Sequence, residues 1–355
     1  MKCSIIIPTH NRPGYLERIL NYYSQNSKDF DIIIADSSTD EIKKVNEETV
    51  SLFSILNIQH LNYYSTGVVP LCKIVDAINH INTKYSVFCA DDDFITPNGI
   101  NQSVDFLEEN LDFSVAHGHY ISFYLKDNRE EDQQFYWRPT YSHESIIIPE
   151  PSARLNYHLS NYSQATFYAV HRTDFMRMIY GETLRFTDEF RFAELLLTML
   201  TSIYGKIKCL DVLYTAREYS GSSLGQTINS IKDYMKDDTY SEKYALFRDC
   251  LSVHLSKQSQ LNIGESKKVI DDAMSAYIKK YYRINPLVNK MVGILDYLRF
   301  PNWIDKNIRA LYRTLFITKR ARQKFYSSFS LEIPLTYEHY DGLNKIRLHV
   351  LSHAK

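Results

Sequence analysis

The sequence predicts an α/β fold: a mostly parallel sheet flanked by helices, followed by a mainly helical carboxy-terminal extension. Short apolar runs rich in β-branched residues alternate with segments of helical periodicity over the first part of the 355-residue chain. This alternation, with short connections, is typical of strand–helix–strand units in a parallel sheet. From about residue 229 onward the periodicity is mostly helical. We therefore expect an α/β domain at residues 1–225 and a helical domain at residues 226–355.

The expected elements follow from their residue types and from the residues that end them. Residues 2–7 form an apolar run ended by a proline, and Pro13 suits the first turn of the helix that follows. Gly205 ends a long, very apolar helical segment at residues 187–204. The other expected elements are strands at residues 31–35, 58–64, 85–90, 167–170 and 208–215 and a helix at residues 70–81. Residues 127–165 are polar, aromatic and irregular, so we expect a loop-rich region that covers a site.

Composition excludes some classes of function. The formal net charge is -1, so no overall positive field would attract nucleic acid. The five cysteines are scattered and lack metal-ligand spacing, which is typical of a reducing compartment. The apolar run at residues 4–7 is too short for a signal peptide, and no stretch of 18 consecutive apolar residues indicates a transmembrane helix. We therefore expect a cytoplasmic protein.

The most informative stretch is VFCADDD at residues 87–93, in which three carboxylates directly follow an apolar run. An apolar run of this length is typical of a buried strand. Asp91, Asp92 and Asp93 would repel one another unless positive charge lies beside them. Mg²⁺ or Mn²⁺ would supply it, because these ions prefer carboxylate oxygens and leave positions open for phosphate. The alternative is a solvated turn, since Asp is common in turns and a Pro-Asn-Gly sequence follows.

Polar residues also follow two other expected strands. Pro8 and Thr9 come after the first strand, and Asp36 and Ser38 come after the second. Ligands bind outside the carboxyl ends of strands in open parallel sheets, so we expect these residues and the three aspartates to converge on one crevice. The alternative for Asp36 is a cap on the helix that follows it.

Four segments, in their order along the chain, resemble the family-2 glycosyltransferases of the GT-A fold. SIIIPTHNRPGYLERIL resembles the first strand and helix of that family, and DIIIADSSTD resembles its second strand, which ends in an aspartate that reads the nucleotide base. FCADDDFITPNG is similar to its metal-binding Asp-x-Asp segment. FAELLLTMLTSIYGKIKCL is similar to the helix that carries its catalytic carboxylate. The resemblance covers residues 2–225.

The resemblance implies an inverting transfer of a sugar from a nucleoside-diphosphate sugar to an acceptor hydroxyl. Asp91 and Asp93 match the Asp-x-Asp segment, which implies Mn²⁺ or Mg²⁺ as cofactor with Asp93 as the foremost ligand. Asp36 would accept a hydrogen bond from a base N–H, which suits a donor of the UDP, GDP or TDP type. The residues that the resemblance assigns to the nucleotide sugar are Pro8, Thr9, Arg12, Asp36, Ser38, Lys73, Asp91, Asp92 and Arg217.

The resemblance also implies a general base on the helix at residues 187–204. Glu194 is the first candidate, from its distance to Gly205. The family usually has adjacent acidic residues, whereas an alanine precedes Glu194 in this chain. Asp188 and Glu189, one to two turns earlier, are therefore competing candidates. A further alternative for Glu194 is an acid placed in the first turn by the helix dipole.

Other functions stay open at this stage. A nucleotidyltransferase would also use an α/β sheet and acidic metal ligands, but it would usually have a glycine-rich phosphate loop, and PTHNRPG has one glycine. A non-catalytic module that binds a sugar nucleotide or a glycan would need the same pocket. By analogy with the family, the expected setting is polysaccharide or glycoconjugate biosynthesis with a glycan or lipid-linked acceptor.

Two further patterns stand outside the resemblance. At 100° per residue, basic residues of the segment 304–324 fall on one stripe and apolar residues on another side; the basic ones are Lys306, Arg309, Arg313, Arg320 and Lys324. This is typical of a helix on an anionic membrane surface, which would place the protein on the inner face of the cell membrane. The alternative is a helix packed on the protein, and the carboxy-terminal helices could also pair in a homo-oligomer. His117 and His119 flank Gly118, and they either bind metal, make a polar contact near the acceptor, or form a simple strand-edge pair.

Overall fold

The computed structural model describes residues 2–65, 70–126, 134–140, 144–162, 166–186, 190–219, 235, 239–281, 326–327 and 337–353. The strands are β1 (Cys3–Thr9), β2 (Asp31–Asp36), β3 (Asn57–Asn62), β4 (Tyr85–Phe88), β5 (Phe94–Ile95), β6 (Phe113–Lys126), β7 (Gln134–Thr140), β8 (Val170–Arg172), β9 (Lys206–Glu218) and β10 (Tyr326–Ser327). The α-helices are α1 (Pro13–Asn26), α2 (Asp40–Leu52), α3 (Pro70–Asn79), α4 (Pro97–Glu109), α5 (Pro151–Ser160), α6 (Thr173–Phe186), α7 (Phe190–Tyr204), α10 (Tyr240–Gln258), α11 (Ile263–Tyr281) and α15 (Tyr337–Ser352). A short 3₁₀ turn, η1, spans Thr166–Tyr168.

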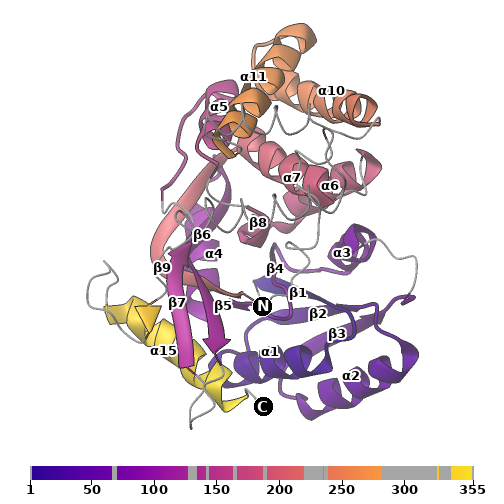
Figure 1. Ribbon diagram of the computed structural model, residues 1–355, viewed down its shortest axis with the longest axis vertical. Coiled ribbons are helices and arrows are strands. Elements are labelled where there is room, and N and C mark those ends of the chain that lie inside the picture. Colours follow the sequence, from indigo (N-terminus) through magenta and orange to yellow (C-terminus); the bar gives the residue numbers. More distant parts are fainter. Residues whose placement is uncertain are drawn as a thin grey trace, which may run out of the picture.

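The described strands form one mixed sheet, with the order β10-β7-β6-β8-β4-β1-β2-β3 (Figure 1). The strands β4, β1, β2 and β3 run parallel, as predicted, so their carboxyl ends lie at the same edge. β8 is antiparallel to both β4 and β6, and it joins this parallel half to the rest of the sheet. β9 runs parallel to β6 and antiparallel to β5. The predicted α/β fold is therefore confirmed, with a mixed sheet.

The two faces of the sheet carry separate hydrophobic cores. In β1, Ile5 and Ile7 point into one core, and Ile6 points into the other, as strand geometry requires. The first core contains apolar residues of α1, α4 and α15, and the second contains those of α3, α6 and α7. Runs such as SIIIPT are apolar at nearly every position because both faces of the strand are covered.

The helices after residue 225 pack on this body in two places. Helices α10 and α11 contribute to the second core beside α5 and α7. Helix α15 crosses to the other face, where Leu343, Ile346 and Val350 are buried in the first core (Figure 1). The helical character predicted for this part agrees with the described elements, except for the two-residue strand β10. The division at residue 225 stays a prediction, and the basic segment 304–324 lies outside the described residues.

The segment predicted to be loop-rich, residues 127–165, contains more regular structure than expected. It includes strand β7, paired with β6, and helix α5, which Pro151 opens at its first turn. The prediction missed β7 because its residues mix polar, aromatic and proline side chains. The strand predicted at residues 167–170 is instead the turn η1 followed by β8.

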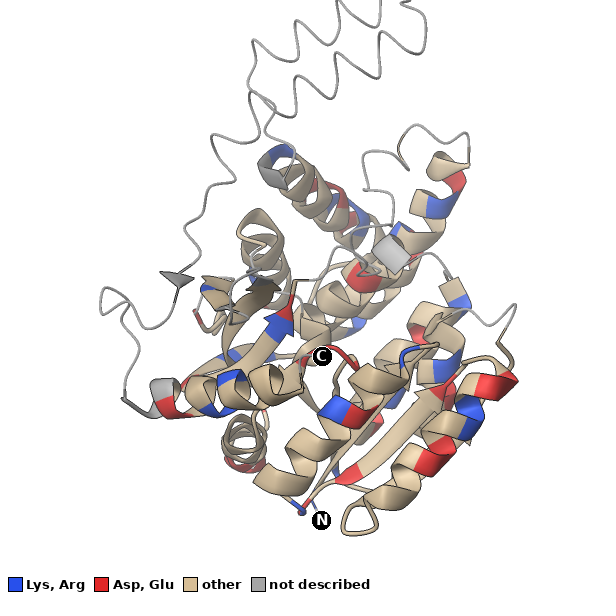
Figure 2. Cartoon of the chain, turned by 60° about the horizontal axis from the view of Figure 1, so that its bottom comes forward, with Lys and Arg blue, Asp and Glu red and all other residues tan. Residues whose placement is uncertain are grey.

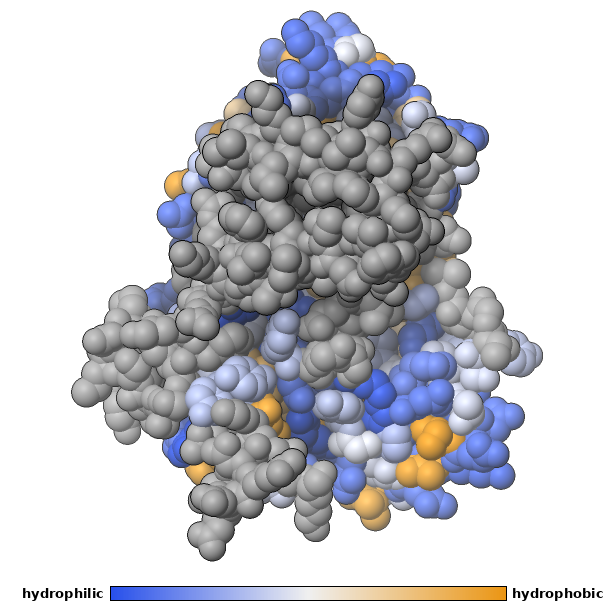
Figure 3. Space-filling model, viewed as in Figure 1, coloured by the Kyte–Doolittle hydropathy of each residue, from blue (hydrophilic) through white to orange (hydrophobic). Residues whose placement is uncertain are grey.

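Neither one sign of charge nor one large hydrophobic patch dominates the described surface in these views. Residues of both charge signs are interspersed along the described helices and strands (Figure 2). In the view of Figure 3 the described surface is mainly hydrophilic, with small separate hydrophobic patches. Among the described residues, no helix combines the length and the apolar character that crossing a bilayer requires.

Gly118 marks the closest approach of β6 and β9, and it provides a test of this packing. A Cβ atom there would clash with the carbonyl oxygen of Val212 in β9. We expect Gly118→Ala to lower the free energy of unfolding by about 1–3 kcal/mol, because the backbone must move to admit the methyl group.

Gly181→Ala is the matched control, since no atom lies within 4 Å of its added Cβ in α6. There, alanine should raise the free energy of unfolding by roughly 0.5–1 kcal/mol through helix propensity. Urea unfolding measures both variants, and equal effects would contradict the packing described.

Candidate active site

The three adjacent aspartates follow β4 at the carboxyl edge of the parallel strands. Asp91, Asp92 and Asp93 are exposed by only 3%, 6% and 3%. β4 pairs with β1, so the turn after β4 lies beside the turn that follows β1. The predicted convergence of these two strand ends is what the structure shows.

Arg12, from the turn between β1 and α1, pairs with two of these carboxylates. Its Nη1 donates a hydrogen bond to Oδ1 of Asp91 at 2.7 Å, and its Nη2 donates to Oδ2 of Asp92 at 2.8 Å. Thr9 Oγ1 donates to the other oxygen of Asp91 at 2.8 Å. The guanidinium also lies over the ring of Tyr15, 4.2 Å from its centroid. The planar fork of arginine is therefore fixed between two acidic side chains.

Asp93 is held by the other half of the sheet. Tyr168 in η1 donates its hydroxyl hydrogen to Oδ2 at 2.5 Å, and the backbone N–H of Glu218 donates to Oδ1 at 2.9 Å. Arg217 Nε lies 3.3 Å from Oδ2, with its guanidinium over the Tyr168 ring. The last residues of β9 thus contact both oxygens of this carboxylate.

The cluster is electrostatically strained. Burial raises the pKa of Asp91 to about 7, against the opposing charge of Arg12. Burial likewise raises the pKa of Asp93 to about 6, against the opposing charge of Arg217. The repulsion expected from the sequence is therefore present, and guanidinium groups of the protein itself compensate part of it.

The donor set of the cluster fits Mg²⁺ or Mn²⁺ chemically, because these ions bind carboxylate oxygens. Asp91 and Asp92 each accept a hydrogen bond from the guanidinium of Arg12, so one oxygen of each carboxylate lies beside this group. The oxygens suited to a cation are thus those that Arg12 and Arg217 already contact. Asp93, the foremost predicted ligand, has both oxygens engaged by Tyr168, Arg217 and Glu218.

Lys73, at the start of α3, reaches the same strand ends. Its Nζ donates to the Thr9 carbonyl oxygen at 2.7 Å and to Ser37 Oγ at 2.8 Å. The residue is 5% exposed, and burial lowers the pKa of its ammonium group to about 8, although Asp36 and Asp91 oppose this shift. A buried cation therefore lies at the ends of β1 and β2, and its predicted contact with the diphosphate stays a prediction.

Asp36 is fully buried and its carboxylate is occupied by the fold. Oδ1 accepts from the backbone N–H of Ser38 at 2.8 Å, while Oδ2 accepts from Asn46 Nδ2 at 2.7 Å and faces His60 Nε2 at 3.1 Å. Despite the cost of burial, hydrogen bonds with His60, Ser38 and Asn46 lower the pKa of Asp36 to about 2. A base could reach this carboxylate only if one of these partners moved.

The residues around Asp36 join the first two strand ends. Ser38 Oγ accepts from the backbone N–H of Asn11, and Asn11 Oδ1 accepts from the backbone N–H of Thr39, both at 2.8 Å. Asn11 has a φ of 54°, in the left-handed region that asparagine tolerates better than most residues. The turn that carries Arg12 is thus tied to the turn after β2.

Glu194 lies in the second turn of α7 and accepts a hydrogen bond from the Tyr162 hydroxyl at 3.2 Å. Thr198, one turn further along the same helix face, contacts Thr166 Oγ1 at 3.2 Å. Thr166 begins the turn η1 that ends in Tyr168, the partner of Asp93. The face of α7 with Glu194 therefore adjoins the segment that leads to the carboxylates. Asp188 and Glu189 lie outside the described residues.

The sequence analysis missed three residues of this network. Arg18 Nη2 donates to the Asp92 carbonyl oxygen at 3.2 Å and to Glu218 Oε2 at 2.6 Å. Arg12, Tyr15 and Arg18 follow one another at intervals of three, and both guanidiniums stack on Tyr15, so helical spacing could have revealed Arg18. Glu218 and Tyr168 gave no such signal.

Comparisons with known proteins agree with this fold. The model of the family described as Glycosyl transferase family 2 matches residues 4–168. The crystal structure of S. aureus TarS 1-349 in complex with UDP-GlcNAc is similar with a TM-score of 0.52 and 15% identity, over 79% of this chain and 73% of that one. The structure of the same protein with UDP has a TM-score of 0.49 and 16% identity, over 80% of this chain and 73% of that one. A comparison with curated protein sequences gave no match.

The sheet topology, the carboxylate cluster and the match together define a glycosyltransferase with a GT-A fold. Residues 4–168 of the chain match the model of glycosyl transferase family 2. The family predicted from the four sequence segments is thereby confirmed.

The buried network of Asp36 predicts a dependence of stability on pH. The folded-state pKa of about 2 lies below the ordinary value of 3.8, so the ionised carboxylate stabilises the fold. We expect Asp36→Asn to lower the free energy of unfolding by on the order of 2 kcal/mol at neutral pH. This stabilisation is fully present above about pH 4 and is lost as the pH falls towards about 2, so the difference from wild type should shrink at about pH 3.

Urea unfolding at both pH values measures this difference. Asp40→Asn is the control, because the Asp40 side chain is 97% exposed. A difference between Asp36→Asn and wild type that stays the same at both pH values would show that the carboxylate charge contributes nothing.

Proposed function

We propose that this glycosyltransferase moves a sugar from a nucleoside-diphosphate sugar to an acceptor hydroxyl, with inversion and with a divalent metal ion. The observation that carries the proposal is the buried cluster of Asp91, Asp92 and Asp93 beside Arg12 and Arg217, at the carboxyl edge of the parallel strands. Parallel α/β sheets bind ligands at this edge. The UDP-GlcNAc complex of TarS supports a donor of the UDP type among the UDP, GDP and TDP types expected.

The charged residues of the site have separate roles in this proposal. Arg12 presents a planar fork that suits two phosphate oxygens as well as two carboxylates. Lys73 and Arg217 add positive charge near the diphosphate, and Pro8, Thr9, Asp36 and Ser38 line the nucleotide pocket. Asp91 and Asp93 would hold Mn²⁺ or Mg²⁺, which when bound supplies positive charge against the leaving diphosphate.

The transfer itself needs a base. Glu194 takes the proton of the acceptor hydroxyl as the acceptor oxygen forms its bond to the anomeric carbon. The bond from that carbon to the diphosphate oxygen breaks on the opposite face, and the electron pair leaves with the diphosphate. The Tyr162 hydroxyl orients the Glu194 carboxylate through its hydrogen bond. Asp188 and Glu189 are the competing bases, and experiment must compare all three.

The acceptor and the setting rest on family analogy. A glycan or a lipid-linked acceptor in polysaccharide or glycoconjugate biosynthesis fits a glycosyltransferase of this family. The basic segment 304–324 would bring the protein to an anionic membrane surface at the inner face of the cell membrane. We also propose that the carboxy-terminal helices pair in a homo-oligomer.

Nucleotide binding tests the donor site. We expect one member of a panel of UDP, GDP, CMP, TDP and ADP to raise thermal stability in the presence of Mn²⁺. A ligand that binds only the folded state stabilises it by about 2.7 kcal/mol at a hundredfold excess over its Kd. Asp93→Asn should lose the metal-dependent part of this stabilisation. Asp105→Asn, at a side chain that is 70% exposed, should keep it. If no nucleotide stabilises folded protein, with or without Mn²⁺, the donor proposal is wrong.

Substitution of the three acids tests the base. Glu194→Gln should lower kcat by about 10²–10⁴-fold with nucleotide binding unchanged, because only proton transfer is lost. Asp188→Asn and Glu189→Gln should have smaller effects, and Glu108→Gln serves as an exposed control. A larger loss in either rival would move the assignment to that residue. NMR of the product reports the anomeric configuration, and retention would contradict the inverting mechanism.

A further inference from the structure

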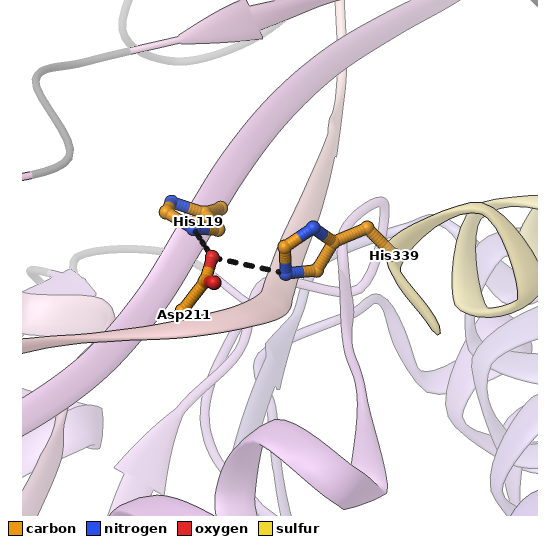
Figure 4. Close-up of side chains that lie close together, drawn as sticks. All are labelled: His119, Asp211 and His339. Atoms are coloured by element: carbon orange, nitrogen blue, oxygen red, sulfur yellow. Dashed lines mark hydrogen bonds and ion pairs between the residues drawn. The ribbon is translucent and has the colours of Figure 1, made fainter. Parts of the chain in front are cut away.

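A separate cluster of potential metal ligands is formed by His119, Asp211 and His339 (Figure 4). The three residues come from β6, β9 and α15. Oδ1 of Asp211 lies 2.7 Å from Nε2 of His119 and 3.4 Å from Nε2 of His339. All the potential ligand atoms lie within 4.8 Å of one another. Both imidazoles therefore direct a ring nitrogen at one carboxylate oxygen.

The local backbone is shaped to bring these elements together. The β6–β9 register shifts on both sides of His119, and such bulges re-aim side chains. Gly118 allows β6 to approach Val212, the residue after Asp211, more closely than any side chain would permit. Gly342, one turn after His339, allows α15 to approach Leu213 of β9, where an added Cβ would lie 3.3 Å from the leucine. Two glycines on two elements thus permit close packing against the same three residues of β9.

We propose that His119, Asp211 and His339 bind a first-row transition metal ion, with Zn²⁺ as the first candidate. Two imidazoles and one carboxylate are a ligand set that zinc uses, with metal–ligand distances of about 2.0–2.2 Å. At tetrahedral angles these lengths separate two ligand atoms by about 3.3 Å, close to the 3.4 Å between Asp211 and His339. His119 would need to move outward by a few tenths of an ångström from its contact with Asp211. The fourth position belongs to water, since the Asp211 side chain is 76% exposed.

The histidine cluster and the aspartate cluster of the candidate active site differ in ligand chemistry. Asp91, Asp92 and Asp93 offer only carboxylate oxygens, which suit Mg²⁺ and Mn²⁺. The histidine cluster offers two imidazole nitrogens, which suit Zn²⁺ and its neighbours in the series. His339 is buried at 1% exposure on the inner side of α15, so the packing of the helix holds this imidazole in place. The inference does not depend on the proposed sugar transfer.

A metal ion at this position would fix α15 to the sheet. The same helix carries His349 further along, and its Nε2 donates to the carbonyl oxygen of Arg18 at 2.9 Å. Arg18 in turn contacts the Asp92 carbonyl oxygen and Glu218. The proposed ion therefore stabilises the helix that supports an arginine of the candidate active site.

Binding of Zn²⁺ alone to the full chain tests the proposal. Protein freed of metal with a chelator is titrated with Zn²⁺ in a calorimeter, and Co²⁺ is added separately to record the visible absorption of a four-coordinate site. We expect one site that Asp211→Asn weakens by at least about 10-fold, the loss typical even of groups that only support metal ligands. Asp211→Asn should fold normally because its side chain is largely exposed. Asp105→Asn and His80→Gln are matched exposed controls that should bind as wild type does.

Further variants separate this site from the others that could bind zinc. His119→Gln should weaken Zn²⁺ binding as Asp211→Asn does, and Asp93→Asn should leave it unchanged. Unchanged binding in both Asp211→Asn and His119→Gln would overturn the proposal. Loss of the site in Asp93→Asn, or in Cys250→Ala from the cluster of Glu182, Cys250 and His254, would also overturn it, because the ion would then bind elsewhere. His339→Gln is needed only to confirm the third ligand, so its failure to fold would not affect the result.

Discussion

Three carboxylates lie next to one another in sequence at the end of β4, and all three are almost fully buried. Burial of a charge costs several kcal/mol unless a partner of opposite sign compensates it. The partners are Arg12, from the turn after β1, and Arg217, near the end of β9. Because these residues are some 200 positions apart, the carboxylates are compensated only when both halves of the sheet have formed. The carboxylate cluster therefore depends on contacts from both halves of the sheet.

Arg18 extends this dependence to the end of the described chain. It stacks on Tyr15, contacts Glu218 at the end of β9, and accepts a hydrogen bond on its carbonyl oxygen from His349 of α15. Helix α15 thus packs in the core of the α/β body, although more than 110 residues separate it from β9. Helices α10 and α11 instead thicken the opposite face beside α5 and α7. The part after residue 225 therefore supports both faces of the sheet.

The sequence predicted the parts of the site that are local and repeated across a family. These parts lie at strand ends or helix starts, where the apolar periodicity stops, and they are Thr9, Arg12, Lys73 and the three aspartates. The structure brings them together. The partners of Asp93 could not be predicted in the same way, because Tyr168 and Glu218 reach it only through antiparallel pairings of β8 and β5. Such pairings depend on contacts between distant residues, which no local pattern encodes. The same reason hid His339, whose cluster partners are in β6 and β9.

Charge balance constrains how the proposed donor site can work. Asp91, Asp92 and Asp93 face two guanidiniums, so the unliganded cluster has an excess of negative charge when all three are ionised. A divalent ion bound to the carboxylates would reverse that excess and release Arg12 and Arg217 from part of their present pairing. A nucleoside diphosphate would then supply the oxygens that these guanidiniums had lost. Metal and diphosphate should therefore bind together more strongly than either does alone, because each compensates the charge that the other leaves. Asp36 adds a second exchange, since a base can hydrogen-bond to its carboxylate only in place of Asn46, His60 or the Ser38 N–H.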